Sequence, residues 1–223
     1  MFGAWQAGAW RSLAPRFQPD LIVGASVGSL NGYAIAAGWS ASDLCAWWLR
    51  SDMAGFKHLP KAIRFLMDAR PLEIDYAVVL VDLLRMKPHT VTGSVIQAEH
   101  LQASCAVPGA ALPQRIEGRW YLDGALLNPL PVWAAVELGA TRILALNALP
   151  DVPSVLLRPL LKGFRASFGH RPALPSGIDL TILAPSRQLG SVRDAIYWKQ
   201  ANIEHWIEQG AADAAALATA APF

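Results

Sequence analysis

The stretch Asp20–Gly32, with the sequence DLIVGASVGSLNG, carries the signal that decides the fold. Its first part, Asp20–Gly24, is a short and largely apolar run, as in strands that are buried on both faces of a parallel sheet. A helix is predicted to follow from about Val27 to Ala37. The residues between them read G-A-S-V-G and match the G-x-S-x-G nucleophile elbow in its strand–turn–helix setting.

The spacing of this motif has a steric reason. Ser26 is predicted to lie in a sharp turn, so Gly24 and Gly28 must be small to avoid collision. The turn raises the serine Oγ to the end of the sheet, and the helix that follows supplies unpaired N–H groups and the positive end of a dipole. An ordinary tight strand-to-helix turn is the alternative interpretation. The flanking strand and helix favour the elbow, with Ser26 as the nucleophile.

Apolar runs and helical patterns alternate along the rest of the chain. Strands are predicted at Ile74–Leu83, His89–Thr92, Trp120–Leu122, Arg142–Leu149 and Ile178–Leu183. Helices are predicted at Phe2–Ala14, from Ser40 or Ser42 to Leu49, and at Ala98–Ala106, Pro129–Leu138 and Val192–Gln209. This alternation predicts an α/β protein, a three-layer α/β/α sandwich with a mostly parallel central sheet. The 223 residues are expected to form a single domain, residues 1–223.

The composition excludes several classes of protein. Hydrophobic residues make up 53% of the chain, which excludes disorder, and charged residues make up 16% where about 25% is usual. A membrane span is not predicted, because no run reaches roughly 18 apolar residues. A net charge of +2 argues against a nucleic-acid binder. Cys45 and Cys105 give no disulfide framework or metal spacing, and no cofactor is predicted. Without a signal-peptide pattern at the start, a cytoplasmic location is expected.

A serine hydroxyl needs a base to become a good nucleophile. The five histidines are His58, His89, His100, His170 and His205. In the order typical of α/β-hydrolases the catalytic histidine comes last, which leaves His170 and His205. His205 is predicted on the polar face of the last helix, and His170 lies in a Gly/Pro-rich loop. A Ser–His–Asp triad with either histidine stays open, and Asp123 at the end of a short strand is the alternative base.

Three blocks of the sequence together resemble the patatin-like phospholipases. They are GASVGSLNG at Gly24–Gly32, ASCAVPGAALP at Ala103–Pro113 and GRWYLDGALLNPLPVWAAVELGA at Gly118–Ala140. The last block is similar to the family's D-G-[GA] motif, carried here by Asp123, Gly124 and Ala125. The resemblance implies a lipid acyl hydrolase with a Ser–Asp dyad and no catalytic histidine. Ser26 would attack the ester carbonyl to form an acyl-enzyme, and Asp123 would take the proton and pass it to the leaving alcohol.

The start of the chain departs from this family, which opens with a strand and a Gly-rich oxyanion loop. Gly3 matches the last glycine of that loop, and Phe2 stands where the family usually has Arg. The oxyanion hole is therefore expected to be partial, with Gly3 and Val27 as backbone donors. We expect the reading frame to extend upstream of Met1 by roughly 10–15 residues that carry the missing strand and loop. Otherwise an impaired lipid-binding or partner-binding module is a third alternative.

Two segments combine cations with apolar residues, a pattern that suits contact with a lipid surface. Leu59–Met67 carries Lys61 and Arg64, and Arg158–Phe168 is predicted to place Arg158, Lys162 and Arg165 together on one outward helical face. Peripheral contact with a membrane is therefore a further expectation, and packing of both helices on the sheet is the alternative. The pair Trp47-Trp48 is interpreted either as a cap on an acyl pocket or as part of the core.

Overall fold

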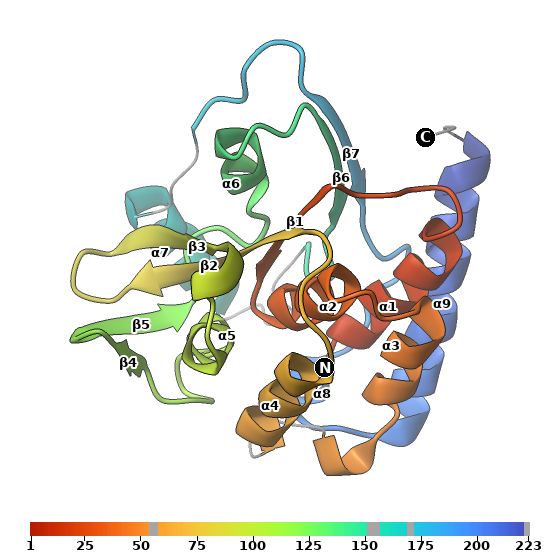
Figure 1. The fold of residues 1–223 in the computed structure, drawn as a ribbon, viewed down its shortest axis with the longest axis horizontal. Coiled ribbons are helices and arrows are strands. Elements are labelled where there is room, and N and C mark those ends of the chain that lie inside the picture. The colour runs from red at the N-terminus through yellow and green to blue at the C-terminus, as the bar shows by residue number, and fades with distance from the viewer. Residues whose placement is uncertain (54–57, 151–156, 169–171, 221–223) are drawn as a thin grey trace.

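Strands and helices alternate in the computed structural model, which describes residues 1–53, 58–150, 157–168 and 172–220 (Figure 1). The helices are α1 (Gly3–Leu13), α2 (Val27–Ala36), α3 (Ala41–Trp48), α4 (Leu59–Ala69), α5 (Ala98–Ser104), α6 (Val132–Glu137), α7 (Leu157–Phe168), α8 (Val192–Ile196) and α9 (Gln200–Ala220). The strands are β1 (Leu21–Ala25), β2 (Asp75–Asp82), β3 (Lys87–Thr92), β4 (Gln114–Ile116), β5 (Arg119–Asp123), β6 (Arg142–Leu146) and β7 (Asp179–Leu183).

The central sheet has five strands in the order β1-β2-β5-β4, with β3 also paired to β2. Strand β1 is parallel to β2, whereas the pairs β2–β3, β2–β5 and β4–β5 are antiparallel. The α/β class is therefore confirmed, but the sheet is mixed rather than mostly parallel. The β4–β5 hairpin, of which only the second strand was predicted, turns at Glu117 and Gly118 with φ of 49° and 82°. Two such values at one turn are typical of a two-residue hairpin.

The register of β2 brings the ends of β1 and β5 together. One edge of β2 is taken by β3, which pairs with Ala77–Asp82. The other edge is shared: β1 runs parallel along it until Ala25 lies opposite Val79, and β5 runs the other way until Asp123 lies opposite Leu80. Because Val79 and Leu80 are consecutive, the carboxyl ends of β1 and β5 meet head to head at this edge.

Helices cover both faces of this sheet. Ile22, Val78 and Leu80 point to the face that carries the main core under α2 and α5. Val23, Ala25 and Val79, one residue out of phase, point to the opposite face, where Trp133 and Ala134 of α6 cover them. Alternate side chains of a strand point to opposite faces, so each strand supplies apolar residues to two layers of helices. The arrangement is the expected α/β/α sandwich.

The second sheet consists of the parallel pair β6–β7. Among the described strands, β1 pairs only with β2 and β6 only with β7, so an edge of β1 and an edge of β6 are left without partners. A groove of about 1020 Å³ lies between them, lined by every residue of Leu21–Ala25 and of Arg142–Leu146. At one end it reaches Gly28, in the first turn of α2. The groove therefore runs up to the elbow.

The two ends of the chain pack together as helices α1 and α9 (Figure 1). A Cβ on Gly8 would lie 1.9 Å from the carbonyl oxygen of Ile207, and one on Gly210 would lie 2.0 Å from that of Trp5. Glycines at both positions thus let the two backbones touch. The last helix was predicted as one element, Val192–Gln209, but α8 stops at Ile196 and α9 continues to Ala220. The break follows from Tyr197, whose backbone is extended at φ −94° and ψ 128°.

Candidate active site

Ser26 lies in the turn between β1 and α2, with backbone angles of φ 52° and ψ −134°. This region is costly for a residue with a side chain and is concentrated at functional sites. Gly24 makes the turn possible, because a Cβ there would lie 2.5 Å from the Cα of Ser29 and 2.6 Å from the carbonyl oxygen of Gly28. The sharp turn expected from the motif is therefore present, and it requires glycine at its first position.

The second glycine of the motif behaves differently from the first. A Cβ on Gly28 would meet the nearest atoms, those of the Gln6 side chain, at 3.7 Å and 3.9 Å. These distances are ordinary van der Waals contacts, so the collision predicted at this position is wrong. Gly28 already belongs to the first turn of α2, where the chain leaves the crowded part of the elbow.

Asp123 ends β5 and is 4% exposed. The Ser26 hydroxyl donates a hydrogen bond of 2.7 Å to Asp123 Oδ2. The backbone N–H of Ala125 donates one of 2.7 Å to Oδ1, so both carboxylate oxygens have partners. Gly124 lies directly against β2: a Cβ there would be 1.9 Å from the carbonyl oxygen of Val79. The small residue after Asp123 thus allows the turn to approach the sheet closely enough for the Ser26–Asp123 contact.

The environment of Asp123 tunes its acidity in two directions. Burial raises the pKa of the Asp123 carboxyl to about 6 from an ordinary 3.8, while hydrogen bonds from Ser26 and Ala125 and the charge of Arg165 oppose the rise. A buried carboxylate in a low dielectric is disfavoured, whereas donors and a cation favour it. A base with a pKa just below neutral is better matched to proton transfer than an ordinary aspartate.

Ser104, the last residue of α5, holds Ser26 and the turn after Asp123 in place and was not singled out from the sequence. Its fully buried hydroxyl accepts a hydrogen bond from the backbone N–H of Ser26 at 3.0 Å and donates one to the carbonyl of Val79 at 2.9 Å. Its own carbonyl accepts from the N–H of Gly124 at 3.3 Å. It therefore ties the elbow, β2 and the turn after Asp123 to one another. The sequence did offer one signal for Ser104, its position in the block Ala103–Pro113 that carries part of the family resemblance.

The two expected oxyanion donors lie at the starts of two helices. Val27 is the first residue of α2, where backbone N–H groups have no acceptor within the helix. Gly3 is the first residue of α1, and its carbonyl accepts a hydrogen bond of 2.9 Å from the side chain of Asn31. A Cβ on Gly3 would lie 2.3 Å from the Trp48 ring, so this position also needs glycine.

The hydrogen bonds found for the Ser26 and Asp123 side chains in the described residues involve no histidine. His205 is exposed on α9, as predicted from its polar face. His89 stacks on Tyr121, with ring centroids 5.5 Å apart, and His100 accepts from the backbone N–H of Gln97 in the first turn of α5. His170, the other candidate for a triad, lies outside the described residues.

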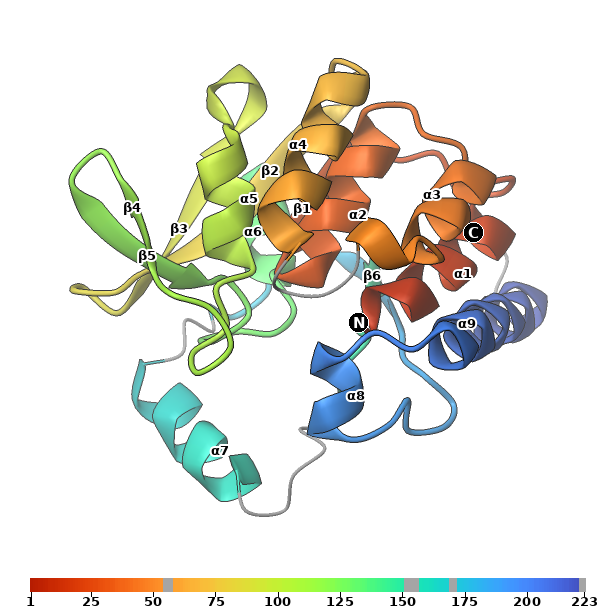
Figure 2. The same cartoon turned by 90° about the horizontal axis from the view of Figure 1, so that it is seen from below.

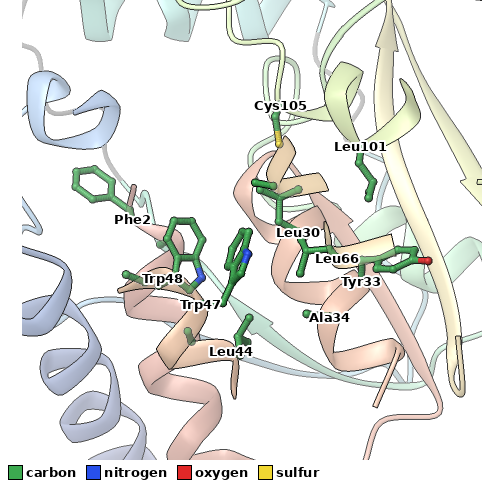
Figure 3. Packing of buried hydrophobic residues seen from close by; sticks show 14 of the residues in the cluster. Phe2, Leu30, Tyr33, Ala34, Leu44, Trp47, Trp48, Leu66, Leu101 and Cys105 are labelled. Carbon is green, nitrogen blue, oxygen red and sulfur yellow. The ribbon is translucent and has the colours of Figure 1, made fainter. Parts of the chain in front are cut away.

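Trp47 and Trp48 belong to the core rather than to a pocket cap. Each is 5% exposed, and Figure 3 shows both rings among buried side chains that include Phe2 and Leu44. The indole N–H of Trp48 donates to Asn31 Oδ1 at 2.8 Å. The alternative in which this pair packs in the interior is therefore correct.

The two segments that combine cations with apolar residues lie in α4 and α7, and each directs some of these side chains toward the protein interior. In α4, Ile63 and Leu66 are fully buried in the core, so packing rather than lipid contact explains them. In α7, the guanidinium of Arg165 donates to backbone carbonyls beside the site, whereas Lys162 is exposed. The expectation that Arg165 shares an outward basic face with Lys162 is wrong.

Comparison with known proteins identifies the family. The profile of the patatin-like phospholipases matches residues 1–96 and 87–136, and the chain belongs to this family. It is 28% identical over 178 residues to the uncharacterized NTE family proteins Mb1092c of Mycobacterium bovis and Rv1063c of Mycobacterium tuberculosis. Each alignment covers 66% of this chain and 49% of the relative. The chain thus spans about half the length of these curated relatives.

A solved structure supports the fold independently. VipD from Legionella pneumophila is similar with a TM-score of 0.56 at 10% identity, over 98% of this chain and 65% of that chain. At this identity the likeness concerns the fold alone. No helix in the described ranges is long and apolar enough to cross a membrane. Within those same ranges, no group of three or more His, Cys, Asp or Glu side chains is arranged to hold a metal ion.

Proposed function

We propose that this chain hydrolyses carboxylic esters of lipids through a Ser26–Asp123 dyad. The observation that carries the proposal is the 2.7 Å hydrogen bond from Ser26 Oγ to a buried Asp123 carboxylate. Membership of the patatin-like phospholipase family supports a lipid substrate. The strained backbone of Ser26 also supports it, since strain at the serine is typical of an elbow nucleophile.

The reaction follows from the positions of the two side chains. Ser26 Oγ attacks the carbonyl carbon of the ester while its proton passes to Asp123 Oδ2. As the tetrahedral intermediate collapses, Asp123 returns this proton to the leaving alcohol and an acyl-enzyme remains. Water then attacks the acyl group, with Asp123 again as the base, and releases the acid. The N–H of Val27, and that of Gly3 from the facing helix, are the proposed donors to the oxyanion.

The groove between β1 and β6 leads us to extend this proposal. In the part of the chain that the structure describes, no strand pairs with either of these edges, and the groove of about 1020 Å³ that they line reaches the elbow. An unpaired edge is a template for another strand. We propose that residues upstream of Met1 supply this strand and the loop that completes the oxyanion hole, as expected from the family's Gly-rich opening. In that form, the domain described here begins one strand into the complete fold.

Peripheral contact with a membrane surface is the last part of the proposal. Phe168 at the end of α7 is 48% exposed, which supports α7 as the contacting element. Substitution of Phe168 by Ser is expected to reduce cosedimentation with liposomes. Equal binding by the variant and the unaltered protein would remove α7 from the proposal.

The experiment that tests the function is hydrolysis of short-chain nitrophenyl esters together with labelling by a fluorophosphonate probe. Ser26→Ala should abolish both signals while the protein keeps its thermal unfolding transition. Labelling that depends on Ser26 would exclude a non-catalytic binding module. If the unaltered protein is neither labelled nor active, and the upstream-extended form is not either, the binding module becomes the better account.

A further inference from the structure

The side chain of Arg165 joins helix α7 to the site. Arg165, partly buried, donates from Nε to the carbonyl of Leu126 at 3.0 Å and from Nη2 to the carbonyl of Ala125 at 3.1 Å. One planar guanidinium thus binds two consecutive backbone carbonyls. Figure 2 shows α7 well away from α9 and from the helices of the main core. Arg165 is therefore a specific tether between α7 and the body of the protein.

The carbonyls that Arg165 binds belong to the turn that follows Asp123. Ala125 takes part in both contacts: its N–H donates to Asp123 Oδ1 at 2.7 Å, and its carbonyl accepts from Arg165. The N–H of Leu126 donates to the carbonyl of Asp123 at 3.1 Å, and the Leu126 carbonyl accepts from Arg165. The cation therefore fixes the same two residues whose N–H groups fix Asp123.

A cation so close to this turn also acts on the charge of the carboxylate. Arg165 is one of the groups that lower the pKa of Asp123, against the larger effect of burial. A guanidinium stays protonated at every pH at which the protein is folded, so its effect is constant. In the low dielectric around a buried carboxylate, such a charge is weakly screened.

We propose that Arg165 is a positioning residue for the reaction, which couples α7 to Asp123 and holds this carboxylate in its ionised, correctly oriented form. The proposal rests on the proposed function for its catalytic consequence. Arg165 does not touch the substrate in this account. It acts through the peptide groups of Ala125 and Leu126 and through its positive charge.

Three variants separate these roles from general packing. Arg165→Met keeps much of the side-chain length but removes both hydrogen bonds and the charge. Arg165→Lys keeps the charge but lacks the planar guanidinium whose N–H groups bind both carbonyls. Lys162→Met, on the exposed side of the same helix, is the matched control for loss of a cation from α7.

The measurements are the pH dependence of ester hydrolysis and the titration of the Asp123 carboxyl carbon followed by NMR. In Arg165→Met, the acid limb of kcat/KM and the carboxyl titration should both move to higher pH, and kcat should fall with little change in KM. Arg165→Lys should keep both midpoints near those of the unaltered protein with a lower kcat. Lys162→Met should change neither. A purely structural role would lower the rate without moving a midpoint.

Failure of the proposal and failure of the proposed function are distinguishable. An Asp123 titration that is the same in Arg165→Met and in the unaltered protein would overturn the role of Arg165, whatever the enzyme does. Equal shifts in Arg165→Met and Lys162→Met would also overturn it. If no ester is hydrolysed but the titration moves as expected, Arg165 controls Asp123 and it is the dyad mechanism that fails. Should Arg165→Met not fold, the Arg165→Lys titration and rate decide.

Discussion

The surroundings of Ser26 differ on its two sides: one is filled by hydrogen-bonded residues and the other faces a groove. On one side, hydrogen bonds with Asp123 and Ser104 fix Ser26, the Asp123 carboxylate and the turn that follows it. On the other side, a groove of about 1020 Å³ separates the edge of β1 from that of β6. In the proposed mechanism, proton transfer therefore depends on residues already in place, whereas stabilisation of the oxyanion depends on what occupies the groove.

The largest expected effect comes from filling the groove. Extending the chain upstream by roughly the length of one strand and a loop should raise kcat for nitrophenyl ester hydrolysis by about 10²–10³-fold for each oxyanion donor gained. The physical reason is that preorganised N–H groups bind the charge that develops in the transition state. Both forms need Ser26→Ala as a control for background hydrolysis. Equal rates from the two forms would mean that the side of Ser26 facing the groove is already complete.

The elbow glycines give a matched pair of substitutions. Gly24→Ala forces a Cβ to within 2.6 Å of backbone atoms, so unfolding free energy should fall by about 3 kcal/mol or more, at the upper end of overpacking costs. Gly28→Ala meets only ordinary contacts at 3.7 Å and should change stability by less than about 0.5 kcal/mol. Denaturant unfolding measures both. Similar losses of unfolding free energy in the two variants would contradict the conclusion that only the first glycine of the motif is sterically required.

Asp123 should reduce stability at neutral pH, because its folded-state pKa of about 6 lies above the ordinary 3.8. The folded protein then binds more protons than the unfolded chain between these values, so this group's contribution declines as pH rises from about 4 to 6. Asp123→Asn should therefore unfold with a free energy higher by up to about 3 kcal/mol at pH 7, since each pKa unit corresponds to about 1.4 kcal/mol.

The advantage of Asp123→Asn should vanish below about pH 4, where the native carboxyl is protonated as well. Denaturant midpoints measured for both proteins from pH 3.5 to 7.5 test this. A gain that is the same at every pH would come from packing and not from the buried charge.

Ser104→Ala is expected to have a smaller effect on stability than Gly24→Ala. It leaves the buried N–H of Ser26 and the carbonyl of Val79 without their partner, at a cost of about 1–3 kcal/mol. Because the N–H of Ser26 also loses its anchor, kcat should fall as well. Ser167→Ala, at an exposed position of α7, is the matched control and should be within about 0.5 kcal/mol of the unaltered protein. An unchanged kcat in Ser104→Ala would mean that Ser104 does not help to position Ser26 for the reaction.

The sequence was informative wherever a local rule sufficed. The strand, turn and helix around Ser26 follow from an apolar run, two glycines and a helical pattern. The role of Asp123 came from a resemblance and is consistent with the register, in which β1 and β5 meet on one edge of β2. That register is also why the sheet is mixed, and no local pattern reports it. A buried hydroxyl such as Ser104 looks like any small helical residue, and Arg165 looks like a surface cation until its partners are known.

The central claim, a Ser–Asp dyad without histidine, is tested most directly by the rate of nitrophenyl ester hydrolysis in two variants. The double variant His170→Ala/His205→Ala should keep kcat/KM within a few-fold of the unaltered protein. Asp123→Asn should lose about 10²–10⁴-fold, the range typical of a general base. A loss of about 10⁴-fold in the histidine variant, of the kind seen when a triad is broken, would contradict the dyad, as would full activity in Asp123→Asn.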